Sequence, residues 1–276
     1  MRMCNKLTKV LVVMLFVLAM VRCKQSPMGT TNSLPVTMDD SSRAIINRAI
    51  AYAGGYETWE QKRTLSFDKK SFSYDSSGKI IREIDQHFDY MMKPEFKAKI
   101  SYRLSDTTIT LIHDGQKARK LYNGKVSNLQ KDIDGAWNSI FGSQFVICMP
   151  FKLKDPGIKA EYVGQVVLKG GIPAQVVKTS YMKGAGSNPE LIWYYYFEPV
   201  TGKLLANSEN GKNNYWDYTG YDKFEKTNGL LMPSVRIGYT ADSLNKPGKM
   251  VSESRSSQIV FDKEFPKDYF NIPDDK

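Results

Sequence analysis

The chain has 276 residues, of which 41% are hydrophobic and 12% aromatic, so it can bury a substantial core and does not have the composition of a disordered protein. Its 39 basic and 29 acidic residues give a formal charge of +10, which nucleic acid, anionic lipid or acidic polysaccharide could each complement. The N-terminal residues narrow this choice of partners.

Residues 1–22 have the features of a secretory signal peptide. Arg2, Lys6 and Lys9 precede an unbroken apolar run over residues 10–21. A bilayer span needs about 20 apolar residues, whereas this run of 12 fits the shorter hydrophobic region of a signal peptide. Its removal leaves 35 basic and 29 acidic residues, a charge of +6. We therefore expect an exported protein that binds no nucleic acid and whose surplus lysines are solvated.

The cysteines predict a lipid anchor. Cys23 directly follows the apolar run, and residues 20–23 resemble a bacterial lipobox, in which the cysteine becomes the lipid-modified N-terminus. Lipoboxes prefer Gly, Ala or Ser before the cysteine, where this chain has Arg22. One of the three cysteines leaves with the signal peptide, and we expect Cys148 to be a buried small hydrophobe. If Cys23 carries no lipid, a disulfide between Cys23 and Cys148 is the alternative.

Residues 24–38 are rich in Ser, Thr and Pro, which is typical of a flexible tether. No acidic cluster, which some surface lipoproteins use for export, follows Cys23, and this favours an outer membrane lipoprotein that faces the periplasm. We predict a signal peptide at 1–22, an anchor and tether at 23–38, and a single domain at 39–276.

The first predicted element of this domain is a helix. Asp39, Asp40 or Ser41 can cap it, and Gly54 with Gly55 ends it. Between them lies an apolar stripe at helical spacing, formed by Ile45, Ile46, Ala49, Ile50 and Ala53. A short helical turn at 57–62 carries Trp59, which we expect to pack back on this helix.

From Thr64 the apolar period becomes two, which predicts antiparallel strands with one buried face. Residues 80–90 and 96–104 follow this pattern, the latter with Phe96, Ile100 and Tyr102 on the apolar face. Between 64–67 and 71–74 the apolar register slips by one residue, which predicts a bulge. Glycine-containing turns recur at hairpin spacing, and one further helix is expected between about 132 and 145.

The sequence offers few residues for catalysis. His87 and His113, the two histidines, each lie in a predicted strand without a zinc-ligand pattern, and structural or surface roles are expected for both. The apolar neighbours of Cys148 predict an inert thiol. We expect no catalytic residue, no metal site and no cofactor. Two carboxylates that meet only in the folded chain would leave a hydrolase open.

Residues 191–206 contain five consecutive aromatic side chains and predict one strand of the sheet. Alternation places Trp193, Tyr195 and Phe197 on one face of the strand and their neighbours on the other. Both faces are apolar enough for other parts of the protein to pack against them. Two interpretations stay open. The strand belongs either to a filled core or to the wall of a cavity that holds an acyl chain.

The order of several segments resembles a family of secreted bacterial lipoproteins of unknown function, with a fold similar to the lipoprotein carrier LolA. The segments are 49–55 followed by Trp59, 149–157, 193–205, 228–233 and 268–273. The resemblance implies an α+β fold of the LolA/LolB type, in which a strongly curved antiparallel sheet, an incomplete β-barrel, wraps around one or two helices. In such carriers the concave side holds acyl chains, although a soluble shuttle has no anchor of its own.

We therefore expect a membrane-anchored, non-enzymatic envelope lipoprotein that binds a lipid or lipoprotein acyl chain on its concave face. The candidate wall consists of Trp193, Tyr195, Phe197, Phe96, Ile100 and Tyr102. The alternative is a structural or interaction lipoprotein with a filled core that acts through its outer surface. A hydrolase on envelope sugars or lipids is the third hypothesis.

Overall fold

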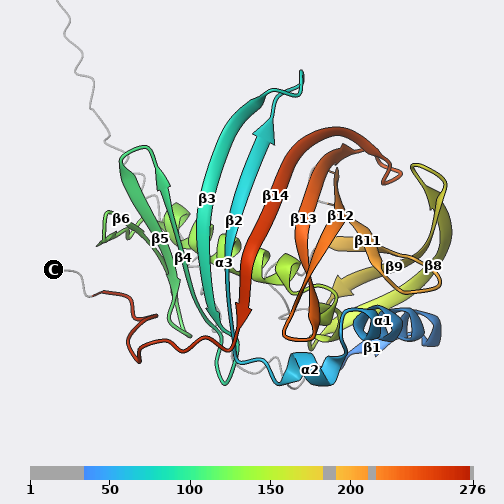
Figure 1. The fold of residues 1–276 in the computed structure, drawn as a ribbon, viewed down its shortest axis with the longest axis horizontal. Helices are drawn as coiled ribbons and strands as arrows, with labels where there is room; N and C mark the ends of the chain where they lie inside the picture. The colour runs from blue at the N-terminus through green and yellow to red at the C-terminus, as the bar shows by residue number, and fades with distance from the viewer. Residues whose placement is uncertain (1–33, 183–190, 211–215, 274–276) are drawn as a thin grey trace, which may run out of the picture.

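Fourteen strands pair into one sheet in the computed structural model, which describes residues 34–182, 191–210 and 216–273 (Figure 1). The strands are β1 Thr37–Met38, β2 Thr64–Tyr74, β3 Ile80–Met91, β4 Lys97–Leu104, β5 Thr107–His113, β6 Ala118–Tyr122, β7 Lys125–Val126, β8 Ile158–Leu168, β9 Ile172–Tyr181, β10 Ile192–Phe197, β11 Leu204–Asn210, β12 Trp216–Thr227, β13 Leu230–Ala241 and β14 Pro247–Phe261. The helices are α1 Asp40–Tyr52, α2 Tyr56–Glu60, α3 Gln130–Ile147 and the 3₁₀ helix η2 Phe151–Lys154.

The strand order is β1-β8-β9-β10-β11-β12-β13-β14-β2-β3-β4-β5-β6-β7. The pair β1–β8 is parallel and the other pairs are antiparallel. β1 and β7 are therefore two separate edges, and the sheet is open. After β1 at one edge and the helices α1 and α2, the chain continues in the middle of the sheet at β2 and runs out to β7 at the other edge. It then crosses back through α3 to β8, beside β1, and returns strand by strand to place β14 beside β2.

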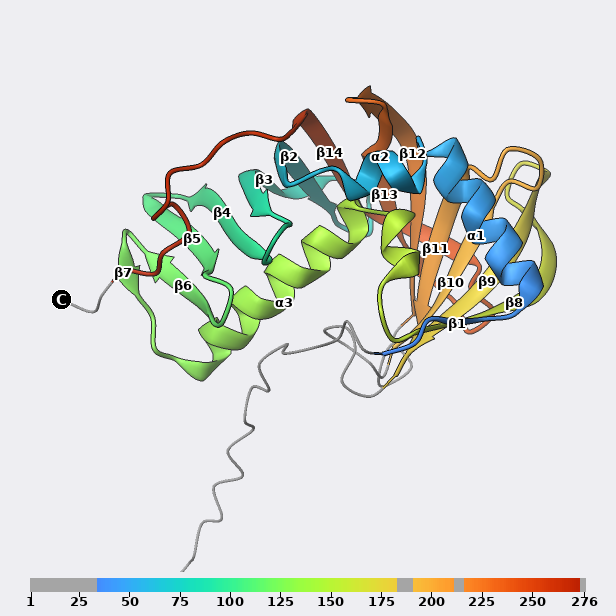
Figure 2. The same ribbon diagram turned by 90° about the horizontal axis from the view of Figure 1, so that it is seen from below.

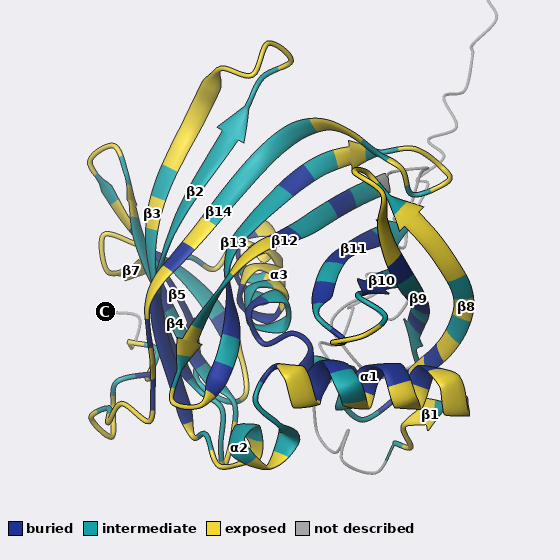
Figure 3. Ribbon diagram, turned by 45° about the vertical axis from the view of Figure 1, so that its right-hand side comes forward, coloured by how far each residue is buried: buried dark blue, intermediate teal, exposed yellow. Residues whose placement is uncertain are grey.

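The sheet is strongly curved, and α3 lies on its concave side (Figures 2 and 3). α3 packs against β4, β5 and β6, whereas α1 packs against β8 and β9 at the other end of the sheet. The predicted curved antiparallel sheet is thus confirmed. In the part of the chain that the structure describes, none of the helices is long and apolar enough to cross a membrane.

α1 forms as its sequence predicts. Asp39 is the N-cap, and its Oδ1 accepts a hydrogen bond from the Ser42 backbone N–H at 2.9 Å. The apolar stripe of the helix is buried. Gly54 follows with φ +111°, and a Cβ there would lie 2.2 Å from the Gly229 carbonyl oxygen. This close approach of two backbones requires glycine at the end of the helix.

The long predicted helix over 132–145 is also confirmed, as α3. It leads into η2, whose Phe151 stacks on the indole of Trp59 with ring centroids 4.7 Å apart. Cys148 is fully buried between the two elements and is not in a disulfide. Cys23, the signal peptide and most of the predicted tether lie outside the described residues. Thr37 and Met38, at the end of that tether, form the edge strand β1.

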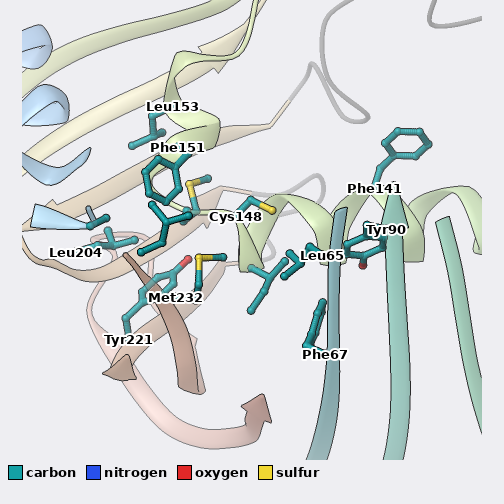
Figure 4. Close-up of a cluster of buried hydrophobic side chains, with 14 of the residues drawn as sticks. Leu65, Phe67, Tyr90, Phe141, Cys148, Phe151, Leu153, Leu204, Tyr221 and Met232 are labelled. Atoms are coloured by element: carbon teal, nitrogen blue, oxygen red, sulfur yellow. The ribbon is translucent and has the colours of Figure 1, made fainter. Parts of the chain in front are cut away.

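Two apolar clusters lie on opposite faces of the sheet. The larger lies on the inner face, which we define as the face toward α1 and α3. Figure 4 shows part of it, where Phe151 lies near Tyr221 and Met232 of the sheet. The smaller lies on the outer face of β9–β12. Tyr195 belongs to the first cluster and Tyr196 to the second, so both faces of the aromatic strand are covered, as its alternation predicts.

The predicted bulge between Phe67 and Phe72 is wrong. β2 pairs with β3 in unbroken register from Thr64 to Ser73. Because successive side chains in such a strand alternate, Phe67 lies on the inner face and Phe72 on the outer face. The outer position is supported by Arg255, whose guanidinium lies 5.3 Å from the Phe72 ring. The slip in the apolar pattern therefore marks a change in which face is apolar.

Candidate functional site

The candidate site is the inner face of the sheet, and its aromatic part begins on β10. Tyr195 and Phe197 are fully buried there, whereas Trp193 is half-buried. Trp193 packs against Phe145 of α3 with ring centroids 5.8 Å apart and is stacked 6.3 Å from Tyr195. Of the three predicted wall residues on this strand, Trp193 is the one that keeps solvent contact.

The other predicted wall residues lie toward the opposite edge of the sheet. Phe96 precedes β4 and packs 5.1 Å from Phe141 of α3. On β4, Ile100 is buried and Tyr102 is half-buried on the same inner face. Six strands separate β4 from β10 in the sheet. The two halves of the predicted wall are therefore connected through α3, because Phe141 and Phe145 are one helical turn apart.

Among the described residues of β9 and β10, three hydroxyl groups on the inner face are buried without a hydrogen-bond partner. They are Thr179 Oγ1 and Tyr181 Oη on β9 and Tyr195 Oη on β10. Burial raises the pKa of Tyr181 and Tyr195 well above its usual value, so both phenols stay neutral. Since buried polar atoms are normally paired, these hydroxyls mark places where a bound molecule could complete the wall.

Next to the aromatic part, the inner face becomes polar. On β2, Lys69, Ser71 and Ser73 continue the row that starts with Phe67. Three serines of β14 lie directly opposite them, with Ser256 facing Lys69. Most of these side chains are partly exposed, whereas Phe67 is buried. Solvent therefore reaches the inner face in this region, which the sequence analysis did not predict.

Two cations belong to this polar region. Burial, and then the charge of Arg236, lowers the pKa of Lys69 to about 7. Burial likewise lowers the pKa of Arg236, although the nearby Tyr221 and Tyr90 partly oppose the effect. The Lys69 ammonium lies 4.7 Å from the centre of the Phe88 ring.

Two carboxylates face each other elsewhere on the inner face. Glu209 of β11 is directly opposite Asp217 of β12 and beside Trp193 of β10. Burial, and then the charge of Asp217, raises the pKa of Glu209 to about 7. Burial also raises the pKa of Asp217. A pair of this kind is what the sequence analysis left open for a hydrolase.

The outer face of β2–β4 carries a charged groove of about 990 Å³, lined in part by Asp68, Asp85 and His87. His87 Nδ1 lies 2.6 Å from Asp68 Oδ1, and its Nε2 lies 3.1 Å from Asp89 Oδ2. Asp89 also accepts a hydrogen bond of 2.6 Å from the Tyr269 hydroxyl. Asp89 therefore joins the sheet to the C-terminal segment, and His87 lies beside it between two carboxylates of the sheet, in keeping with the structural or surface role expected from the sequence.

His113 is buried at the end of β5. Its Nδ1 lies 3.1 Å from the Phe96 carbonyl oxygen, and burial lowers its pKa. Within the described ranges, no group of three or more His, Cys, Asp or Glu side chains lies close enough to hold a metal ion. The chemistry of the inner face is thus that of aromatic rings, hydroxyls and a few charged groups.

A comparison with protein-family models matches residues 33–208 to a family described as "Family of unknown function (DUF6503)". A search of the curated proteins finds no match. Among solved structures, a DUF1329 family protein from Desulfovibrio piger is 12% identical, with a TM-score of 0.54 over 84% of this chain and 98% of that one. A LolA superfamily protein from Nitrosomonas europaea is 8% identical, with a TM-score of 0.53 over 83% and 97%. These likenesses concern the fold, and they confirm its predicted LolA-like class.

Proposed function

The chain belongs to the DUF6503 family, a family of unknown function, and we propose that it is a membrane-anchored, non-enzymatic envelope lipoprotein that binds a lipid or lipoprotein acyl chain on the inner face of its sheet. One observation carries this proposal. Half-buried Trp193 and Tyr102 lie at opposite ends of an aromatic inner face whose two halves meet at α3.

The aromatic residues suit an acyl chain for a physical reason. Each methylene removed from water contributes about 0.8 kcal/mol, so ten buried methylenes contribute about 8 kcal/mol. That exceeds the cost of ordering one flexible chain against a rigid wall. A strand that presents Trp193 beside the fully buried Tyr195 and Phe197 is such a wall, because the buried rings hold the exposed one in place.

The LolA-like fold supports a place in the cell envelope. In this proposal Cys23 carries the lipid that anchors the chain to the outer membrane, and residues 24–36 tether the domain on the periplasmic side. An anchored domain of this kind holds its acyl chain near the membrane, whereas a soluble carrier moves between membranes.

The test uses the full chain with Cys23→Ser, exported to a bacterial periplasm and purified without detergent. Its mass is measured by native mass spectrometry before and after extraction with organic solvent. A stoichiometric added mass that disappears on extraction, with an acyl lipid in the extract, is the expected result. A bare protein mass even after incubation with phospholipid vesicles would reject the proposal and direct attention to the charged groove on the outer face.

Glu209 and Asp217 favour one second candidate, an acid–base hydrolase of envelope glycans. Side chains directly opposite in an antiparallel pair have Cβ atoms about 5 Å apart, a spacing compatible with the carboxyl pair of a retaining glycosidase. With its pKa raised to about 7, Glu209 can hold a proton at neutral pH and act as the acid. The assay is hydrolysis of aryl glycosides and peptidoglycan. Activity lost in Glu209→Gln supports this candidate, and an inactive wild type rejects it.

A further inference from the structure

We infer that the inner face carries a site for the anionic headgroup of an acyl lipid, formed by Lys69, Arg236 and Ser256. The inference deepens the proposed function and rests on it, since it names the class of lipid that the aromatic wall would hold. The three residues come from β2, β13 and β14, which are neighbours in the sheet.

The strand register brings the three side chains to one place on one face. Ser256 of β14 lies directly opposite Lys69 of β2. Arg236 of β13 lies directly opposite Ser254, two residues before Ser256 and therefore on the same face. Lys69 and Arg236 are close enough for the charge of one to lower the pKa of the other. Two basic side chains are thus held together inside the curve of the sheet.

The side-chain hydrogen-bonding groups of Lys69, Arg236 and Ser256 have no partner among the described residues. Among the hydrogen bonds and ion pairs of the described residues, none involves the side chain of Lys69 or Arg236. The Ser256 hydroxyl is buried and has no partner either. By contrast, the outer-face cation Lys70 lies 2.8 Å from Glu83.

Burying a cation away from water without a carboxylate beside it costs free energy, and an anion that binds between two such cations offsets that cost. The Phe88 ring beneath Lys69 compensates only part of it. A carboxylate or phosphate could accept charge-assisted hydrogen bonds from the ammonium and the guanidinium, and a further one from the serine hydroxyl.

The surroundings indicate that this anion belongs to an amphiphile. Along β2 the inner face presents Ser73, Ser71, Lys69, Phe67 and Leu65 in that order, and exposure falls in the same direction. Phe67 stacks on Phe88 with ring centroids 4.6 Å apart, so the apolar surface begins directly beside the ammonium. A headgroup at Lys69 would therefore place its chain along the aromatic part of the inner face.

The experiment compares two probes with the same C18 hydrocarbon tail, oleate below its critical micelle concentration and oleyl alcohol below its solubility limit. Each is titrated into the full-length protein with Cys23→Ser, and tryptophan fluorescence is measured. Inorganic phosphate is the third probe. We expect oleate to bind at least about 10-fold more tightly than the alcohol. Lys69→Gln and Arg236→Gln should each weaken oleate binding about 10-fold or more, the size of a lost charge-assisted hydrogen bond, and leave the alcohol unchanged.

Lys70→Gln, which removes a paired cation on the adjacent outer-face position, is the matched control and should bind both probes as the parent does. Cooperative unfolding at or above the melting temperature of the parent establishes that the variants are folded. Equal affinity for oleate and the alcohol, or equal losses for both in the variants, overturns the headgroup site and leaves the proposed function standing. Phosphate that binds as tightly as oleate assigns the site to a free anion and overturns the lipid assignment. Binding of neither amphiphile overturns the proposed function as well.

Discussion

Tyr221 of β12 and Arg236 of β13 lie directly opposite each other, so the inner face changes from an aromatic ring to a guanidinium within one cross-strand pair. Burial raises the pKa of Tyr221 to about 12 and lowers that of Arg236. The phenol therefore stays neutral, and the guanidinium, which starts from a very high value, stays charged at neutral pH. This pair therefore marks the boundary between the aromatic part and the polar part of the inner face.

Phe197→Ala and Trp193→Ala should separate these two effects on a single strand. Phe197 is fully buried, so its truncation should lower the free energy of unfolding by about 3–5 kcal/mol. Trp193 is half-buried, and its truncation should cost less than half as much while weakening acyl-chain binding. Urea denaturation and oleate titration of both variants provide the comparison. Equal stability losses would mean that Trp193 is core like its neighbour.

Lys69→Met should stabilise the protein near neutral pH. The pKa of Lys69 is about 7 in the folded chain against an ordinary 10.5, so the unfolded chain binds more protons between these values. The stability of the wild type should therefore rise as the pH rises from about 7 to 10.5. The advantage of Lys69→Met should be largest at pH 6–7 and disappear toward pH 10.5.

Urea denaturation at pH 6, 8 and 10 measures this trend. Lys70→Met is the control, because Lys70 is partly exposed on the outer face and forms an ion pair with Glu83. A difference between wild type and Lys69→Met that stays constant with pH would contradict the prediction.

Cys148 should not react with thiol reagents in the folded protein. Burial raises its pKa to about 12, so at pH 8 almost no thiolate is present, and no solvent reaches the sulfur. Iodoacetamide followed by intact mass measurement should find the chain with Cys4→Ser and Cys23→Ser unmodified in buffer and singly modified in urea. Rapid labelling of the native protein would show that the region between α3 and η2 opens readily.

Asp89→Asn should loosen the C-terminal segment. Asp89 is buried on the outer face and accepts hydrogen bonds from Tyr269 and from Lys263, the latter at 3.3 Å. Burial acts to raise its pKa, but the Tyr269 hydrogen bond and the Lys263 charge contribute to holding it below the ordinary 3.8. The loss of a carboxylate that two donors share should cost about 3 kcal/mol.

The contribution of Asp89 should be complete above pH 3.8 and be lost as the pH falls through its lower folded-state value. Limited proteolysis of residues 262–273 and urea denaturation measure the effect. Asp85→Asn, on an exposed position of the same strand, is the control. If both variants were equally stable, the contacts of Asp89 would contribute nothing to holding the segment.

The aromatic half of the candidate site was predictable from the sequence, but its polar half was not. Trp193, Tyr195 and Phe197 were expected on one face because period-two alternation decides which residues share a face. The alternation around Lys69 and Ser71 gives no sign of an inner-face position, since lysine and serine are usually exposed. In fact these residues continue the inner row of Phe67, and Phe72 and Tyr74 lie outside.

The sequence by itself determined the local elements. Asp39 caps α1, Gly54 ends it, and the apolar periods specify the helices and the pairs of residues that share a strand face. Only the tertiary structure decided which face turns inward, because that depends on strand order and on where α1 and α3 pack. Arg236 meets Lys69 across β14 although 166 residues lie between them in the chain. No periodicity within a strand carries that information, since it arises from pairing between distant segments.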